Sequence, residues 1–528
     1  MKFKFLTLIA ITILILAACS KTQNGQTSGM DHDQMNMSEE KKEAGLPQST
    51  DTKILTGNTI NIVAKEANHQ LNNNVNVTAW TFNGSVPGSQ IRVKQGEKVK
   101  IHLKNELPDP VSIHWHGIPV PNEMDGIPGV TQNAVQPGES FTYEFIASVP
   151  GTYMYHTHQD GVNQLDKGLY GSFIVEPKEK SYDKDFTLML DEWMSNPTEM
   201  DSQMSGMDHS NMSGMNHGNS SNNSEQQSES QDGQASMTHD MSMYDIYTIN
   251  GKSGDSIKPL SVKKGEKVRL RLINIGFLSH NIHLHGHKFK VVAIDGQELN
   301  EPQEIQDQLV AIAPGERYDI EFTANNPGKW FLEDHGDMNG TGGMKTVISY
   351  EGAKDTADQS NQQETLPVFN FNSYGKNTES KFTLNQKYDV EYTMDLNTAQ
   401  KDGNTFYTIN GKSFPNTDAI QVKKGDKVKV KLVNNSPTGD HPMHLHGHFF
   451  QVLSKNGVPV EGSPIMKDTI NLKPGDEYVI AFEANTPGNW LFHCHDLHHA
   501  TAGMVDLVKY EGFKPGFTPD SKAGNKPE

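Results

Sequence analysis

The strongest constraint on the fold is a motif that occurs three times along the chain. Starting at Lys94, Lys263 and Lys423, the sequence reads KQGEKVKIHLKN, KKGEKVRLRLIN and KKGDKVKVKLVN. Apolar and charged residues alternate within each copy, which is the pattern of a β-strand with one buried face. Each copy follows an Asn-Gly pair and precedes two Pro-Gly turns, so the order of turns recurs as well.

The copies lie about 160 residues apart, which is far longer than the repeats of solenoid proteins. Short strands punctuated by Gly and Pro favour Greek-key β-sandwiches, and stretches with a helical period are scarce. We therefore predict an all-β protein that contains three copies of one β-sandwich domain.

The predicted organisation of the 528 residues places the three domains between flanking segments. It comprises a signal peptide at 1–18, a flexible tether at 19–52, domain 1 at 53–180, domain 2 at 181–352, a linker at 353–366, domain 3 at 367–512 and a tail at 513–528. Within domain 2, residues 200–243 are rich in Ser, Asn, Gly, Met and His. We expect this insertion to be disordered.

The N-terminus has the pattern of an export signal. Lys2 and Lys4 precede an apolar run of about 14 residues, which is too short for a membrane span. Residues 16–19 (LAAC) resemble the cleavage box of bacterial lipoproteins. That resemblance implies a lipid on Cys19 and a location on the outer face of the cytoplasmic membrane, with the lipid as the only membrane contact. An ordinary signal peptide or an uncleaved anchor is the alternative.

A net charge of −19 argues against nucleic acid as a partner and suits cationic ligands such as metal ions. Metal ligands are present in a regular pattern, because four His-x-His pairs occur in the first and third copies. The pairs are His114 with His116, His156 with His158, His444 with His446, and His493 with His495. Side chains two residues apart in a strand share a face. These eight imidazoles could surround a small metal cluster.

Cys494 lies between His493 and His495, so its side chain points to the opposite face if the segment is extended. It would belong to a second site behind the cluster. A thiolate with two histidines and a weak methionine is the donor set of a blue copper site. Candidates for the other ligands are His441, His499 and Met504. The backbone of 493–495 would then join the two sites, and a zinc site or a metal-free sandwich fits this pattern poorly.

The motifs HWHG, HTH, HPMHLHGH and HCHDLHHATAGM appear in the order seen in three-domain multicopper oxidases, and over residues 53–512 the chain resembles this laccase-like family. The resemblance implies cupredoxin-like domains, dioxygen as a substrate and four copper ions per chain, one type 1, one type 2 and a type 3 pair. It implies type 1 ligands His441, Cys494, His499 and Met504, type 2 ligands His114 and His444, and type 3 ligands His116, His156, His158, His446, His493 and His495.

The resemblance also assigns acidic groups near the copper ions. Asp125 matches the family's acidic residue near the type 2 copper and could deliver protons as a catalytic residue. Many bacterial relatives carry an acid directly after the histidine that follows the cysteine, but here that position is Ala500. Asp496 and His498 are nearby alternatives for proton transfer.

The second copy keeps part of this pattern. Asp334 stands where the third copy has its cysteine, Glu333 replaces a cluster histidine, and Asn339 replaces a type 1 histidine. We therefore expect no type 1 copper in domain 2. We interpret His283 and His285 as structural histidines whose hydrogen bonds are satisfied, and adventitious metal binding by these two residues is the alternative.

The insertion gives a hypothesis for the electron donor, because thioether sulfur is a soft ligand that favours cuprous ion. Its capture residues would be Met200, Met204, Met207, Met212, Met215, His209 and His217. We therefore favour a cuprous oxidase that acts in copper tolerance. One alternative is a laccase that acts mainly on phenols or other small organic reductants. Another is a surface protein that sequesters copper without turnover.

Overall fold

The computed structural model describes residues 45–195, 243–336, 343–353, 365–401 and 403–527. The repeated motif forms a central strand in one sheet of each of three domains. These strands are β5 (Lys98–Asn105), β13 (Lys267–Asn274) and β24 (Lys427–Asn434). Each pairs in parallel with an earlier strand and antiparallel with a later one, and the alternating apolar side chains of β5 are fully buried.

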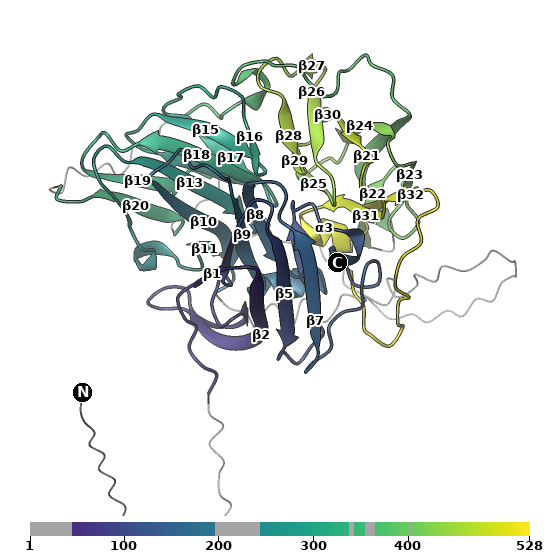
Figure 1. Ribbon diagram of the computed structural model, residues 1–528, viewed down its shortest axis with the longest axis horizontal. Helices are drawn as coiled ribbons and strands as arrows, with labels where there is room; N and C mark the ends of the chain where they lie inside the picture. Colours follow the sequence, from purple (N-terminus) through teal and green to yellow (C-terminus); the bar gives the residue numbers. More distant parts are fainter. Residues whose placement is uncertain (1–44, 196–242, 337–342, 354–364, 402, 528) are drawn as a thin grey trace, which may run out of the picture. The chain divides into compact units, whose positions relative to one another are not determined.

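Domain 1 consists of two sheets that share one apolar core, coloured purple to blue in Figure 1. One sheet has the order β3 (Asn76–Phe82), β2 (Thr59–Gln70), β5 and β7 (Ser140–Ile146). The other has the order β1 (Ile54–Thr56), β4 (Gln90–Lys94), β9 (Tyr170–Glu176), β8 (Gly151–His156) and β6 (His114–His116). A short helix, α1 (Gly161–Asp166), and a 3₁₀ turn, η1 (Asn122–Met124), lie in the connections.

Domain 2, drawn in teal in Figure 1, repeats the arrangement. Its first sheet has the order β11 (Ile246–Ile249), β10 (Lys184–Trp193), β13, β18 (Arg317–Thr323), β15 (Phe289–Ile294) and β16 (Gln297–Glu298). Its second has the order β12 (Leu260–Val262), β20 (Lys345–Tyr350), β19 (Lys329–Asp334), β14 (His280–Leu284) and β17 (Val310–Ile312). The 3₁₀ turn η4 (Gly254–Ser256) precedes β12.

Domain 3 is drawn in green to yellow. Its first sheet has the order β22 (Asn404–Ile409), β21 (Val390–Lys401), β24, β30 (Glu477–Glu483), β26 (Phe450–Lys455) and β27 (Val458–Pro459), and β28 (Ile465–Lys467) pairs with β26. Its second has the order β23 (Ile420–Val422), β32 (Val505–Tyr510), β31 (Asn489–Cys494), β25 (His441–Leu445) and β29 (Thr469–Leu472). The 3₁₀ turn η5 (Phe371–Ser373) precedes this domain, and α3 (Leu497–Thr501) follows β31.

The predicted all-β class with three similar sandwiches is confirmed. The Asn-Gly pairs form the expected turns, and in the second copy Asn250 and Gly251 have φ values of 53° and 69°. No helix within the described ranges is long and apolar enough to cross a bilayer. The signal peptide, Cys19, the tether up to residue 44, and residues 200–242 of the insertion lie outside the described residues.

Candidate metal centres

The strand β31 separates the cysteine from its two histidine neighbours. It pairs with β25 so that Cys494 is opposite Met443 and His493 is opposite His444. Cross-strand partners point to the same side of a sheet, so His493 and His444 share one face and Cys494 occupies the other. The extended geometry inferred from the sequence is therefore present.

Behind β31, the fully buried Cys494 lies close to two imidazoles. Its Sγ lies 3.6 Å from Nδ1 of His499 and 3.8 Å from Nδ1 of His441, and these two nitrogens are 3.2 Å apart. Burial, together with the neighbouring His499 ring, lowers the pKa of His441 to about 3. A neutral imidazole keeps the lone pair that a metal requires.

Local structure brings these side chains to the cysteine. Asp496 caps α3 by accepting a hydrogen bond from the backbone N–H of His498, and the turn that follows carries His499. Met504 is fully buried, and its carbonyl accepts a 3.1 Å hydrogen bond from the Cys494 N–H. Tyr407 stacks on His499 with ring centroids 3.9 Å apart, leaving that histidine 8 % exposed.

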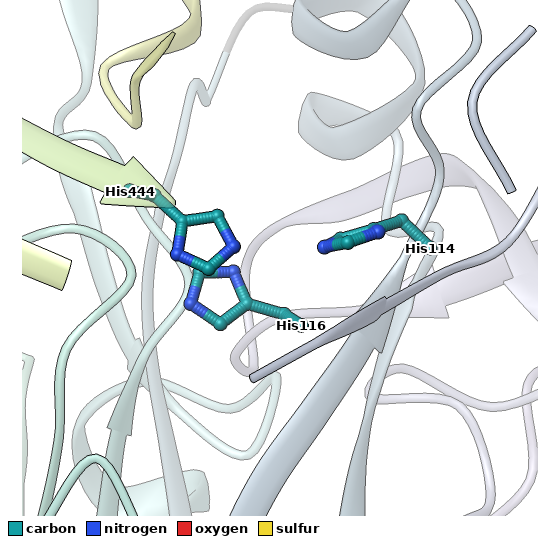
Figure 2. Close-up of side chains that lie close together, drawn as sticks. All are labelled: His114, His116 and His444. Atoms are coloured by element: carbon teal, nitrogen blue, oxygen red, sulfur yellow. The ribbon is translucent and has the colours of Figure 1, made fainter. Parts of the chain in front are cut away.

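The eight paired histidines converge between domains 1 and 3. They form three groups in which the ligand atoms lie within 4.8 Å of one another: His114 with His116 and His444, His116 with His156 and His495, and His158 with His446 and His493. All eight are at most 2 % exposed. Figure 2 shows the rings of His116 and His444, whose centroids are 3.7 Å apart, lying against each other, with the ring of His114 beside them.

Backbone carbonyls orient several of these rings. Nδ1 of His114 lies 2.9 Å from the carbonyl of Asp125, and Nδ1 of His444 lies 3.0 Å from that of Asp468. Nδ1 of His156 lies 2.7 Å from the carbonyl of Thr157. With Nδ1 held on the outside, Nε2 is left for the interior, which is how proteins orient metal-binding histidines.

The inward nitrogens test whether the site fits a metal. Nε2 of His114, His156 and His444, and both ring nitrogens of His495, have no hydrogen-bond partner within the described part of the chain. Buried polar atoms are normally bonded, so several unbonded nitrogens facing one space indicate ligands for ions. Burial and the neighbouring imidazoles hold the pKa of His156 and His495 well below the usual range, so these rings are neutral donors. The arrangement therefore fits a buried metal cluster.

Two carboxylates brace the cluster from outside. Asp125 lies beside His114 as predicted, with one oxygen 3.0 Å from Nδ1 of His446 and the other 3.3 Å from Nδ1 of His114. Asp468 lies 3.2 Å from Nε2 of His116 and accepts two 2.6 Å hydrogen bonds from Arg317 of domain 2. Burial raises the pKa of Asp468, but the Arg317 guanidinium outweighs it and holds this pKa well below the ordinary value.

Sequence reasoning missed Asp468 because it lies outside the histidine motifs. Strand pairing places it directly before β29, where the matching residue of the second copy is Gln308. That difference between the copies was the signal in the sequence that could have identified Asp468.

Ala500 is fully buried in an apolar cluster with Ile127 and Leu491. Asp496 contacts both His498 and His499, at 3.1 and 3.3 Å.

The predicted tail contributes a contact that the sequence did not suggest. The carbonyl of Pro527 lies 2.5 Å from Nδ1 of His158. The backbone N–H of Asp160 donates a 2.9 Å hydrogen bond to the carbonyl of Lys526, and Nε2 of Gln159 donates a 2.7 Å bond to the carbonyl of Gly524. Residues 524–527 thus orient one cluster histidine from the outer side of domain 1.

The second copy has an ion pair where the third has its cysteine site. His280 lies between the carboxylates of Glu192 and Asp334. Met344, the residue that matches Met504, is fully buried. Asn339 lies outside the described residues. The interpretation of His283 as a satisfied histidine is wrong, because neither of its ring nitrogens has a hydrogen bond within the described ranges.

Comparison with known proteins agrees with this architecture. Three domain profiles described as multicopper oxidase match residues 63–180, 212–353 and 382–511. The chain is 29 % identical to multicopper oxidase MmcO of Mycobacterium tuberculosis, over 82 % of this chain and 83 % of that protein. It is 24 % identical to copper resistance protein A of Escherichia coli, over 83 % and 91 %. The crystal structure of Fet3p, described as a multicopper oxidase that functions in iron import, shares the fold with a TM-score of 0.71 at 22 % identity, over 89 % and 93 %.

The chain has three cupredoxin-like sandwiches, and adjacent residues of β31 belong to a buried cysteine site and to a histidine cluster. These features define an oxidase whose cofactors are copper ions. The chain belongs to the multicopper oxidase family.

Proposed function

We propose that this enzyme couples the one-electron oxidation of cuprous ion to the four-electron reduction of dioxygen to water. The observation that carries the proposal is the placement of Cys494 on one face of β31 and of His493 on the other. A protein that only stores metal has no need of two different centres joined through adjacent residues of one strand.

The proposed ligand sets follow the three groups of converging side chains. Type 1 copper would be held by His441, Cys494, His499 and Met504, and type 2 copper by His114 and His444. The type 3 pair would be held by His116, His156 and His495 on one side and by His158, His446 and His493 on the other. Copper bound in these four positions supplies one-electron redox chemistry at the first and dioxygen reduction at the other three.

The chain itself provides the connection between the two centres. Cys494 and His493 are bonded neighbours, and Nδ1 of His493 lies 2.9 Å from the carbonyl of Cys494. An electron leaving the thiolate therefore has a covalent route and a hydrogen-bonded shortcut to a cluster histidine. Cys494 is fully buried, so water is excluded along this route.

Asp125 is the proposed proton donor to the cluster. Its carboxylate is 1 % exposed and contacts Nδ1 of both His114 and His446, so it lies within one residue of the reacting space. Asp468 contacts His116 and Arg317, and we assign it a positioning role because its charge is already neutralised by the guanidinium. Ala500, where many bacterial relatives carry an acid, offers no titratable group for this role.

The small accessible edge of the type 1 site favours a small electron donor. Tyr407 covers one face of His499, and only 8 % of that residue is exposed. A metal ion can reach such an edge more readily than a bulky phenol can stack on it. The Met- and His-rich insertion supplies soft ligands for cuprous ion, and a relative of Escherichia coli carries the name copper resistance protein A. Phenols and other organic reductants are the alternative donors.

The same proposal places the enzyme outside the cytoplasm. The apolar segment and the LAAC sequence support export and lipid attachment at Cys19. Labelling with a radioactive fatty acid, with Cys19→Ala as the control, tests this part. Soluble secretion of the intact sequence without label would contradict it.

Deleting residues 200–242 tests the choice of donor. Met243 is kept because it packs against the buried residues of domains 1 and 2. We expect the copper-loaded deletion variant to keep its blue absorption and its rate with a phenol, while its kcat/KM for cuprous ion falls. An unchanged rate with cuprous ion would remove the reason for preferring it over a phenol.

Oxygen consumption by the copper-loaded full chain separates oxidase from storage. We expect uptake of one dioxygen for every four cuprous ions oxidised. A protein that sequesters copper would consume none with any donor.

A further inference from the structure

Domain 2 keeps, at matching positions, some of the histidines whose counterparts in domain 3 belong to the metal cluster. Its strands β14 and β19 pair with His283 opposite Glu333 and Leu284 opposite Leu332. This is the register of β25 and β31, where His444 is opposite His493. His283, His285, Glu333 and His335 therefore occupy, in domain 2, the face that carries metal ligands in domain 3.

The side chains on this face come within the span of a single ion. Ligand atoms of His283, His285 and His335 lie within 4.8 Å of one another. Nε2 of His335 is 3.4 Å from Nε2 of His285, and Oε1 of Glu333 is 2.9 Å from His285 and 3.6 Å from His335. Two imidazoles on one tetrahedral ion with bonds of about 2.0–2.1 Å have nitrogens about 3.3 Å apart. The observed spacing of His285 and His335 matches that value.

His283 lacks the partners that a structural histidine has. It is 3 % exposed, and neither ring nitrogen makes a hydrogen bond to any described residue; its nearest carboxylate, Asp307, is 3.8 Å from Nε2. His287, four residues later, shows the contrast. Its Nδ1 lies 2.9 Å from the carbonyl of His285 and its Nε2 lies 2.6 Å from the hydroxyl of Tyr350. A buried imidazole without such bonds is costly unless a ligand binds it.

We propose that His283, His285, His335 and Glu333 form a mononuclear site for a divalent transition cation of the zinc or cupric kind. Three imidazoles and one carboxylate are a donor set that such ions favour. The second oxygen of Glu333 lies 3.0 Å from Nζ of Lys345, which orients the carboxylate and leaves Oε1 on the histidine side.

Access distinguishes this site from the oxidase cluster. The side chains of His285 and His335 are 18 % and 20 % exposed, and Asp307 at its edge is 53 % exposed. An ion can therefore exchange directly with solvent. The site also has no cysteine behind it, because Asp334 occupies that position in β19. It therefore binds a cation without a route for electrons to leave.

Zinc binding to the copper-loaded full chain tests the site, since zinc adds no colour and no redox chemistry. Equilibrium dialysis against Zn²⁺, followed by metal analysis, compares the natural chain with a His285→Ala/His335→Ala double variant. We expect the natural chain to retain one more zinc per molecule. The control is His102→Ala, a histidine of domain 1 whose Nδ1 lies 2.8 Å from the hydroxyl of Thr142, and it should retain zinc like the natural chain.

Unchanged blue absorption and far-UV circular dichroism in the double variant will show that it has folded. If the double variant misfolds, the single His335→Ala change provides the test, with an expected loss of zinc affinity of at least about 10-fold. Equal zinc stoichiometry and affinity in the natural chain and the folded variant would overturn the proposal. That outcome would leave the proposed oxidase function untouched, because oxygen consumption does not depend on this site.

Discussion

Asp468→Asn tests how much the Asp468 carboxylate and its hydrogen bonds contribute to copper binding. The carboxylate accepts two 2.6 Å hydrogen bonds from Arg317, accepts a 2.9 Å bond from the hydroxyl of Thr469, and lies 3.2 Å from Nε2 of His116. Asparagine has nearly the same shape but carries no charge, and its amide group would face the guanidinium as a second donor.

We expect the substitution to lower the free energy of unfolding and to weaken metal binding. Removing one partner of a buried ion pair typically costs about 3–5 kcal/mol. Asp295, 3.6 Å from Nη1 of Arg317, remains as partial compensation, so we expect a loss near the lower end, about 3 kcal/mol. Loss of an outer partner of a metal-binding histidine typically weakens metal binding by about 10–100-fold. The site formed by His114, His116 and His444 should be affected most, because Asp468 contacts two of these rings.

The assay is copper retention during dialysis against a chelator, with the blue absorption as an internal reference. We expect Asp468→Asn to lose cluster copper faster than the natural protein, to keep its blue absorption, and to unfold at a lower temperature. Asp418→Asn is the matched control, because Asp418 forms an ion pair with the exposed Lys412 and such pairs contribute about 0–1 kcal/mol. Equal copper retention and equal thermal midpoints for the two variants would refute the reasoning.

Three further changes test other parts of the structure. Cys494→Ser should abolish the blue absorption and the oxidase activity while leaving the far-UV circular dichroism unchanged, and a variant that stayed blue would show that the thiol is not a ligand. His280→Gln should remove a pH dependence of stability: burial lowers the pKa of His280, but Glu192 and Asp334 raise it to about 10, so the contribution is full below about pH 6.5 and is lost as pH rises toward 10. Thermal midpoints of both proteins at pH 6 and 9 measure it, and parallel shifts would contradict the assignment. Truncation before residue 523 should release the outer side of His158 and speed copper loss from the cluster; copper retention equal to that of the full chain would show that the contact with Pro527 is dispensable.

The sequence predicted those features that depend on local periodicity. The alternation in the repeated motif predicted strands with one buried face, since it places Val99, Ile101 and Leu103 on the same side, and the recurring turns predicted the sandwich. The two-residue spacing around Cys494 was enough for the separation of the two centres, because it depends only on the strand being extended. Both inferences use only patterns that are local in the sequence.

Contacts between segments far apart in the chain were not predictable in this way. Arg317 reaches Asp468 across 151 residues, and Glu192 reaches His280 across 88. No local pattern marks either pair, because their meeting depends on how two sheets or two domains pack. The interpretation of His283 failed for the same reason, since hydrogen-bond satisfaction depends on neighbours that the motif does not contain.

The contact of residues 524–527 with domain 1 has a consequence for biosynthesis. Ribosomes make a chain from its N-terminus, so His156 and His158 are synthesised hundreds of residues before the carbonyl of Pro527 that holds one of them. The orientation of the His158 ring is therefore complete only after residue 527 has been made. Copper that enters the cluster earlier would meet a His158 ring that lacks its contact with Pro527, which favours loading after residues 524–527 have docked on domain 1.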